Sequence, residues 1–403
     1  MTRRVVVTGI GLVSPHGDTP GAVFDALMEG RSAIARWTSA GMPPAAVARA
    51  AFDVSRWFTR LQLAGVDRVS QIAVAAAELA RADAGFEGLD DRSGIYVGTG
   101  MGGAAAIDEA FARYAESGRV PPLTVPAFMP NAPAAHIAMR AKVHGPVLTY
   151  SIACASSAVA IAEAAKAVAA GDVECALAGG SEALLVPGAI RAWQALQTLA
   201  SPGSEDPSRA CRPFAADRTG LVLGEGAAFL LLEPLDAAKA RGARVYAELA
   251  GSGVSCDATH LTKPDAAGQV RALVSALRAS GLSPADVGYC NAHGTATRAG
   301  DVVECEALAQ VWGDAIGDLA VSSTKSMHGH LLGAAGALEA AITVLALERG
   351  ALPPNMHCGP QDPACRVSLV QQPHTEAPQL RAAISNSFAF GGTNAVLVFR
   401  RCD

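Results

Sequence analysis

The sequence has few aromatic residues, at 5%, and few charged residues, at 17%. No run of lysine and arginine occurs, and the formal net charge is -5, which excludes a general nucleic-acid binder. The 9 cysteines include no Cys-x-x-Cys pair, and their odd number suits reduced thiols better than a disulfide framework. Because no Cys/His cluster has zinc-ligand spacing, we expect no metal site.

The start of the sequence also lacks a long apolar run. "MTRRVVVTGIG" has two basic residues and a short β-branched stretch broken by glycines, so neither a signal peptide nor a membrane span fits. We therefore expect a cytoplasmic protein. At 403 residues and 50% hydrophobic, the chain can bury a sizeable core. Its most loop-like segment, 201–220, is expected to shape a site.

Short β-branched segments alternate with alanine-rich segments of helical length, which predicts an α/β protein. The expected strands lie within 3–11, 92–100, 145–153, 173–180, 287–294, 318–326, 381–392 and 394–401. The motifs "AGGSEA" and "FGGTNA" follow strands in the two halves of the chain, which suggests an internal duplication. The two similar units would span 1-240 and 241-403.

Cys154 follows one of these strands. The residues after it, to position 170, carry only Glu163 and Lys166 as charges before Gly171 provides a stop, so a buried helix is expected. At the N-terminus of that helix the dipole would lower the pKa of the thiol, and backbone N–H groups could stabilise an oxyanion. The alternative is that Cys154 is a small core residue, the commonest role of a cysteine.

Polar groups elsewhere favour the functional alternative. His293 ends an expected strand beside two threonines, and Lys325 and His330 lie in a turn that enters another helix of small residues. A glycine loop, "SNSFAFGGTN", follows near the C-terminus. A lone histidine is usually structural, but three polar groups at strand ends together with a cysteine at a helix start indicate a site.

An ordered set of motifs along the chain includes "IACASSAVAIAEA", "RPFAADRTGLVLGEGAAFLLLE", "NAHGTATRAGD", "STKSMHGHLLGAAGALEA" and "NSFAFGGTNAVLVF". In order and spacing the chain resembles the β-ketoacyl-acyl carrier protein synthases of the elongating type, synthases I and II, in the thiolase-fold superfamily. The resemblance implies two duplicated halves that form a five-layered αβαβα core. The half 1-240 would carry Cys154, and the half 241-403 the histidines, Lys325 and the Phe390 loop.

The resemblance also implies roles for individual residues. Cys154 would accept the acyl chain, and His293 and His330 would promote decarboxylation of a malonyl unit. The remaining implied residues are the supporting pair Lys325 and Glu339, the backbone N–H groups of Cys154 and Phe390 as oxyanion hole, Thr295 and Thr297 for the phosphopantetheine arm, and Phe388 and Phe390 as pocket residues.

The implied reaction is a decarboxylating Claisen condensation of acyl-ACP with malonyl-ACP in fatty acid synthesis, where ACP is acyl carrier protein. The enzyme would need no cofactor of its own. It would form a homodimer, or a heterodimer with a related subunit, and would be cytoplasmic. The alternative within the family is a type II polyketide or polyene ketosynthase. Ala215, His328 and Ala389 depart from the family pattern and hint at a specialised member.

Acyl carrier proteins are acidic, so we expect a local basic docking patch, with Arg60, Arg68 and Arg209 as candidates. Three other interpretations stay open at this level. Gly98, Gly100 and Gly103 match a dinucleotide-binding motif, although no acidic residue follows at the required distance. A papain-like hydrolase and a non-catalytic scaffold subunit are the other two.

Overall fold

The computed structural model describes residues 3–202, 206–374, 376–377 and 379–402. The expected loop 201–220 therefore lies partly outside the described residues. Eleven strands form one sheet in the order β12-β11-β10-β13-β14-β9-β1-β8-β6-β4-β5. Their bounds are β1 Val5–Val13, β4 Ser93–Gly98, β5 Val147–Tyr150, β6 Cys175–Glu182, β8 Gly226–Pro234, β9 Ala247–Cys256, β10 Tyr289–Asn291, β11 Ala320–Ser322, β12 Ser368–Leu369, β13 Ala382–Phe388 and β14 Thr393–Arg400.

The sheet has two halves, because β1 pairs with β9 through only two residue pairs, Val6 with Glu248 and Val7 with Ala247. Strands of the first half run from β1 to β5 along the sheet, and those of the second from β9 to β12. A separate small sheet contains β2 Ile34–Trp37, β3 Ala45–Ala48 and β7 Leu223–Gly224. All eight expected strands are confirmed.

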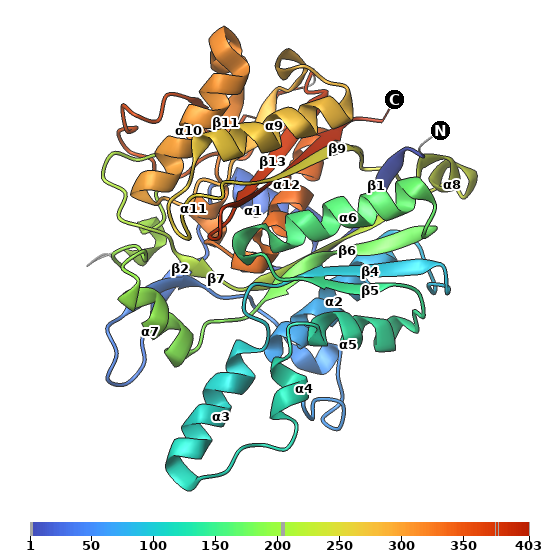
Figure 1. Ribbon diagram of the computed structural model, residues 1–403, viewed down its shortest axis with the longest axis vertical. Coiled ribbons are helices and arrows are strands. Elements are labelled where there is room, and N and C mark those ends of the chain that lie inside the picture. The colour runs from blue at the N-terminus through green and yellow to red at the C-terminus, as the bar shows by residue number, and fades with distance from the viewer. Residues whose placement is uncertain (1–2, 203–205, 375, 378, 403) are drawn as a thin grey trace.

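Helices cover both halves of the sheet and fill the space between them (Figure 1). Their bounds are α1 Pro20–Met28, α2 Arg68–Asp83, α3 Ala104–Ser117, α4 Thr124–Phe128, α5 Ala132–Ala141, α6 Ser156–Ala170, α7 Pro187–Ala195, α8 Leu235–Ala240, α9 Ala266–Ser280, α10 Arg298–Trp312, α11 Lys325–His328 and α12 Ala335–Arg349. Helices α2 and α5 pack outside the first half, α9 and α10 outside the second, and α6 and α12 lie between the halves. This is the expected five-layered αβαβα core.

The two central helices show the internal duplication. Each has 15 residues and follows a 3-10 turn that begins with a left-handed residue, Ala153 with φ 43° before α6 and Leu332 with φ 40° before α12. Each ends at a glycine with positive φ, Gly171 and Gly350, as a left-handed helix cap requires. The protein therefore contains an internal duplication, which includes the two turns that precede α6 and α12.

The motif match that suggested the duplication is wrong in detail. "AGGSEA" lies mostly inside β6, with Gly180 paired to Gly98 of β4. "FGGTNA" instead forms the turn between β13 and β14, where Gly391 and Gly392 have φ of 90° and 77°. The glycines of the first motif serve close packing, since a Cβ on Gly180 would lie 2.6 Å from a backbone oxygen. The two motifs are similar in sequence, but their glycines are needed for different physical reasons.

The expected buried helix is confirmed as α6. Residues Ala153–Ala170 are long and apolar enough to cross a membrane by length and composition alone, but 67% of this stretch is buried inside the protein. Burial is possible because Gly98 of β4 has no side chain: a Cβ there would lie 2.2 Å from the backbone nitrogen of Ser157. The apolar composition of the helix therefore reflects its place between the sheet halves.

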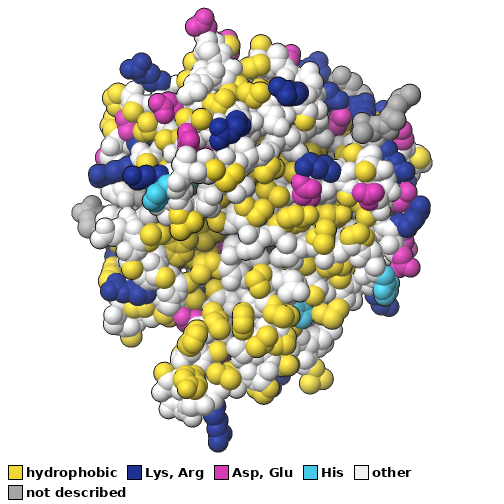
Figure 2. Space-filling view, in the orientation of Figure 1, with side chains coloured by type: hydrophobic (Ala, Val, Ile, Leu, Met, Phe, Trp, Pro, Cys, Tyr) yellow, Lys and Arg dark blue, Asp and Glu magenta, His cyan; other side chains and the backbone are white. Residues whose placement is uncertain are grey.

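One edge of the sheet is uncovered. β5 is the last strand of the first half, and its residues Val147 and Leu148 are 36% and 44% exposed. Further apolar side chains, among them Phe111 and Tyr114, are exposed on α3, and Figure 2 shows apolar side chains gathered over α3 and α4. An unpaired strand beside such a surface is suited to pairing with a second chain.

Candidate active site

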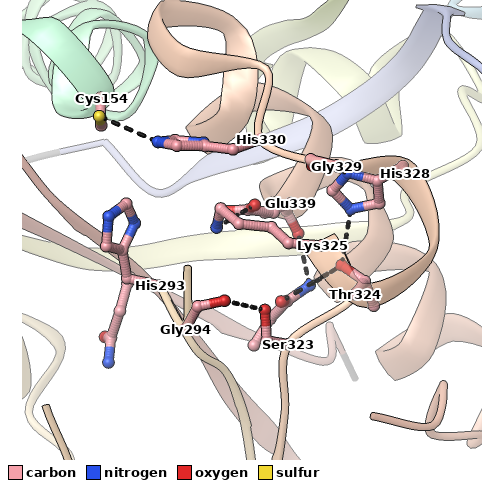
Figure 3. Close-up of polar contacts among 12 residues, drawn as sticks. Cys154, His293, Gly294, Ser323, Thr324, Lys325, His328, Gly329, His330 and Glu339 are labelled. Carbon is pink, nitrogen blue, oxygen red and sulfur yellow. Dashed lines mark hydrogen bonds and ion pairs between the residues drawn. The ribbon is translucent and has the colours of Figure 1, made fainter. Parts of the chain in front are cut away.

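Cys154 lies in the 3-10 turn Ala153–Ala155, between β5 and α6. Its side chain is buried, and its Sγ atom is 3.0 Å from Nε2 of His330 (Figure 3). His330 precedes the equivalent turn before α12, and its backbone N–H donates to the carbonyl of Val222 at 2.6 Å. The duplicated turns therefore bring the cysteine and one histidine into contact.

His293 follows the end of β10 and faces the same point. Its ring centroid is 5.3 Å from that of His330, with the rings nearly perpendicular at 83°. The backbone carbonyl of Gly294 accepts a 2.6 Å hydrogen bond from the hydroxyl of Ser323 after β11, which fixes the segment to the neighbouring strand. The three side chains predicted as a catalytic set are thus together.

Glu304 of α10 holds the His293 segment in place. Its carboxylate accepts the backbone N–H of His293 at 2.8 Å and that of Gly294 at 2.7 Å, and the Asn386 amide at 3.0 Å. The sequence analysis missed Glu304. The available signal was its spacing, because Glu304 lies four positions before Leu308, and both residues are on the buried face of the helix.

Both histidines are neutral at physiological pH. Burial, and then the positive charge of Lys325, lower the pKa of His293 and of His330 well below the ordinary histidine value. Lys325 forms a fully buried ion pair with Glu339 of α12. Burial raises the pKa of Glu339 to about 7, against the influence of Lys325. In Figure 3 the predicted pair lies next to the two histidines, on the side away from Cys154.

The expectation of a lowered thiol pKa is wrong for the free protein. Burial raises the pKa of Cys154 to about 12, which outweighs the opposing effects of Lys325 and of a hydrogen bond from the backbone of Phe390. The reason is that the free-energy cost of desolvating a thiolate in a buried site exceeds the stabilisation that a helix N-terminus gives to the thiolate. Cys154 is therefore a thiol in contact with a neutral imidazole.

A cavity of about 260 Å³ leads to Cys154. Predicted residues in its lining are Thr295, Thr297, Phe388, Phe390 and both histidines. The two threonine hydroxyls are 3.1 Å apart. Trp193 of α7, which the sequence analysis missed, stacks on Phe390 with ring centroids 6.1 Å apart and an angle of 21° between the ring planes.

A second, open groove has a volume of about 1020 Å³ and is lined by Asp286, Arg400 and others. It contains none of the predicted site residues.

The three residues that depart from the family pattern, Ala215, His328 and Ala389, do not disturb the set of Cys154, His293 and His330. His328 points away from Cys154: its Nε2 lies 3.0 Å from the hydroxyl of Thr324 and its Nδ1 2.7 Å from the carbonyl oxygen of Gly329. Ala215 is fully buried, and Ala389 lines the cavity.

The glycine motif does not form a dinucleotide site. The backbone N–H groups of Gly100, Met101 and Gly333 donate to the carboxylate of Glu182 at 2.7, 3.1 and 3.0 Å. In a dinucleotide-binding loop these donors would face the pyrophosphate. Here a buried side chain of the protein occupies them, so this interpretation of the sequence is wrong.

Of the three candidate docking arginines, Arg68 is not available. Its guanidinium binds the carboxylate of Glu225 at 2.6 Å and the carbonyl of Ala50 at 3.0 Å. Arg60 and Arg209 are exposed.

All 9 cysteines are free thiols, as expected.

Comparisons with known proteins give matches that cover most or all of the chain. Two family models match the chain: "Beta-ketoacyl synthase, N-terminal domain" over residues 2–238 and "Beta-ketoacyl synthase, C-terminal domain" over residues 246–359. The chain is 37% identical over 419 residues to 3-oxoacyl-[acyl-carrier-protein] synthase 2 of Rhizobium meliloti, across 99% of both chains. It is 39% identical over 409 residues to Nodulation protein E of the same species, across 100% of both. The solved ishigamide ketosynthase/chain length factor matches with a TM-score of 0.93 and 33% identity, across 100% of both chains.

Proposed function

Because the chain belongs to the beta-ketoacyl synthase family, we propose that it catalyses the decarboxylating Claisen condensation of acyl-ACP with malonyl-ACP. The products are 3-oxoacyl-ACP, carbon dioxide and free ACP. The observation that carries the proposal is the 3.0 Å contact between the Cys154 thiol and His330, with His293 on the same cavity. This set provides a nucleophile and two neutral imidazoles in a site of low polarity.

In the first half-reaction, Cys154 Sγ attacks the carbonyl carbon of the acyl thioester. Because the thiol is protonated, its proton passes to Nε2 of His330, the group in contact with it. The backbone N–H groups of Cys154 and Phe390 stabilise the oxyanion. The carbon–sulfur bond to the carrier then breaks, and the carrier thiol takes the proton.

In the second half-reaction, malonyl-ACP enters the emptied cavity. Neutral His293 and His330 donate hydrogen bonds to the thioester oxygen, where negative charge develops as carbon dioxide leaves. For this step His330 carries its proton on Nε2, whereas loading of Cys154 uses the tautomer with Nε2 free. The resulting carbanion attacks the carbonyl carbon of acyl-Cys154, the bond from that carbon to Sγ breaks, and the released Cys154 thiolate takes a proton from solvent. Donors of this kind are each worth about 10²–10³ in rate.

The remaining residues position these groups. Lys325 and Glu339 supply a charged pair behind the histidines, and the hydroxyls of Thr295 and Thr297 bind the phosphopantetheine arm. Phe388 and Phe390 line the acyl pocket, and Phe388 also contacts His293, with ring centroids 6.0 Å apart. We propose that the enzyme uses no organic cofactor and acts in the cytoplasm.

A second candidate is the synthesis of a specialised acyl chain by a type II polyketide or polyene ketosynthase. It is supported by the similarity to the ishigamide ketosynthase/chain length factor. In this case a related subunit without the cysteine would replace the second copy of the chain. Incubation with acyl-ACPs of different length and unsaturation, followed by intact-mass analysis, separates the two candidates by which acyl group is retained.

The test of the mechanism separates loading from decarboxylation. His293→Ala should keep appreciable acylation of Cys154, measured by intact mass, while elongation falls by orders of magnitude. Cys154→Ala should lose acylation and keep some release of labelled carbon dioxide from malonyl-ACP. His144→Ala, on an exposed histidine, is the control and should change neither step. Normal elongation by His293→Ala, or an acyl group on another cysteine, would contradict the assignment.

A further inference from the structure

The catalytic set also has the composition of a metal site. Cys154, His293 and His330 each offer one ligand atom, a sulfur or a ring nitrogen, and these three atoms lie within 4.8 Å of one another. All three side chains are buried. One thiolate and two imidazoles with a vacant fourth position suit tetrahedral zinc, at about 2.3 Å from sulfur and about 2.0 Å from nitrogen.

The two histidine rings already lie around the sulfur. Nε2 of His330 is 3.0 Å from Sγ of Cys154, and the ring centroid of His293 is 5.3 Å from that of His330. The charged groups around this point are Lys325 of α11, Glu339 of α12, Glu182 of β6 and Glu304 of α10. Above a pH of about 7 the ionised carboxylate of Glu339 balances the charge of Lys325, so the nearby lysine does not leave an unbalanced positive charge against a cation.

We propose that Cys154 Sγ and one ring nitrogen each of His293 and His330 reversibly bind a thiophilic divalent cation, with zinc as the preferred ion and water in the fourth position. Binding releases the thiol proton to solvent and changes no oxidation state. The ion and an acyl group compete for the same sulfur. Bound zinc therefore inhibits acyl loading, a property beyond the condensation itself.

The affinity should be lower than that of a structural zinc site. In a metal-binding histidine, the N–H of the second ring nitrogen usually donates a hydrogen bond to an acceptor. Loss of that acceptor lowers the affinity for the metal about 10–100-fold. Among the described residues, Nδ1 of His293 and Nδ1 of His330 have no hydrogen-bond partner. Acyl substrate can therefore displace the ion, and the inhibition should be reversed by a chelator.

The experiment uses cobalt(II) as a spectroscopic probe on the free full-length protein, without substrate. We expect one ion per chain, a thiolate-to-cobalt charge-transfer band in the near ultraviolet and visible bands of tetrahedral cobalt. Added zinc should displace the cobalt and so remove both the charge-transfer band and the tetrahedral cobalt bands. Cys154→Ser should lose the charge-transfer band and His293→Ala the tetrahedral bands, whereas Cys256→Ser and His144→Ala, on exposed residues, should retain them. Thermal unfolding of each variant checks that it folds.

Proton release provides a second readout. At about pH 8, binding should release one proton per ion, from the thiol, because the histidines carry none. Nearer neutrality the number should exceed one, since Glu182 and Glu339, both with pKa about 7, also lose protons when a cation binds. Calorimetry in buffers of different ionisation enthalpy measures this number.

Absence of the charge-transfer band in the wild-type protein, or its persistence in Cys154→Ser, would overturn the metal proposal. Loss of the band in Cys256→Ser would place the ion elsewhere and would also overturn it. Because the titration contains no acyl substrate, its failure leaves the proposed condensation untouched. Failure of Cys154 to accept an acyl group would likewise leave the metal site standing.

Discussion

Nε2 of His330 lies 3.0 Å from Sγ of Cys154, although the two residues are 176 positions apart in the sequence. Cys154 lies in the turn Ala153–Ala155 before α6, and His330 comes just before the equivalent turn, Leu332–Ala334, which precedes α12. The contact therefore depends on the packing of α6 against α12 between the two halves of the sheet. The predictions below test the groups around this contact.

The reactivity of Cys154 should rise steeply with pH. With a thiol pKa of about 12, the thiolate fraction, and hence the alkylation rate, should increase about tenfold per pH unit up to pH 9. Mass spectrometry after timed iodoacetamide treatment measures the rate at this residue. A plateau below pH 9 would show that the neighbouring imidazole already holds the thiol proton in the free enzyme.

Glu304 should act as a positioning residue for His293. Glu304→Ala leaves two backbone N–H groups without their acceptor, at a cost of about 1–3 kcal/mol for each buried group. We expect at least a tenfold loss of kcat for elongation, while acylation of Cys154 is retained. Glu304→Gln, which keeps one carbonyl acceptor, should restore part of kcat.

The matched control is Glu306→Ala, an exposed carboxylate on the same helix, which should behave as the wild type. A purely structural role for Glu304 would reduce acylation and elongation equally. Single-turnover loading followed by steady-state elongation distinguishes these outcomes.

The buried ion pair should tolerate joint replacement better than a single change. Lys325→Met leaves Glu339 without its partner, and breaking a buried pair costs about 3–5 kcal/mol. The double variant Lys325→Met/Glu339→Leu should recover much of this loss, because both desolvation penalties disappear. Urea unfolding measures the free energies.

The exposed pair on α6, Lys166 with Glu163 at 2.7 Å, gives the comparison. Lys166→Met should have little effect on stability, because water screens an exposed pair. Equal effects of the two lysine replacements would show that burial of the Lys325 pair does not control its energy.

The protein should form dimers through the β5 edge. Val147→Lys places a charge on an exposed apolar strand and should shift the protein to monomers in light scattering at micromolar concentration. Val274→Lys, at an exposed position of α9, is the control and should leave the dimer intact. A wild-type monomer at this concentration, or dissociation of the control, would contradict the prediction.

The sequence by itself determined eight strands, the helix after Cys154 and the order of the site residues, but it did not reveal the central strands β8 and β9. All expected strands form, and the helix after Cys154 ends at Gly171, because apolar runs and a left-handed cap are local signals. The motif set also identified the family, since short ordered motifs place His293 and His330 relative to strand and helix ends.

Only the tertiary structure decided the chemical state of the site. Burial, which no local pattern reports, raises the pKa of Cys154 to about 12 where a helix terminus alone would lower it. Contacts between residues far apart in the sequence join Cys154 to His330, 176 positions away, and Asn386 to Glu304, 82 positions away. The physical reason is that desolvation and hydrogen-bond partners depend on which segments pack together, and sequence spacing does not measure that.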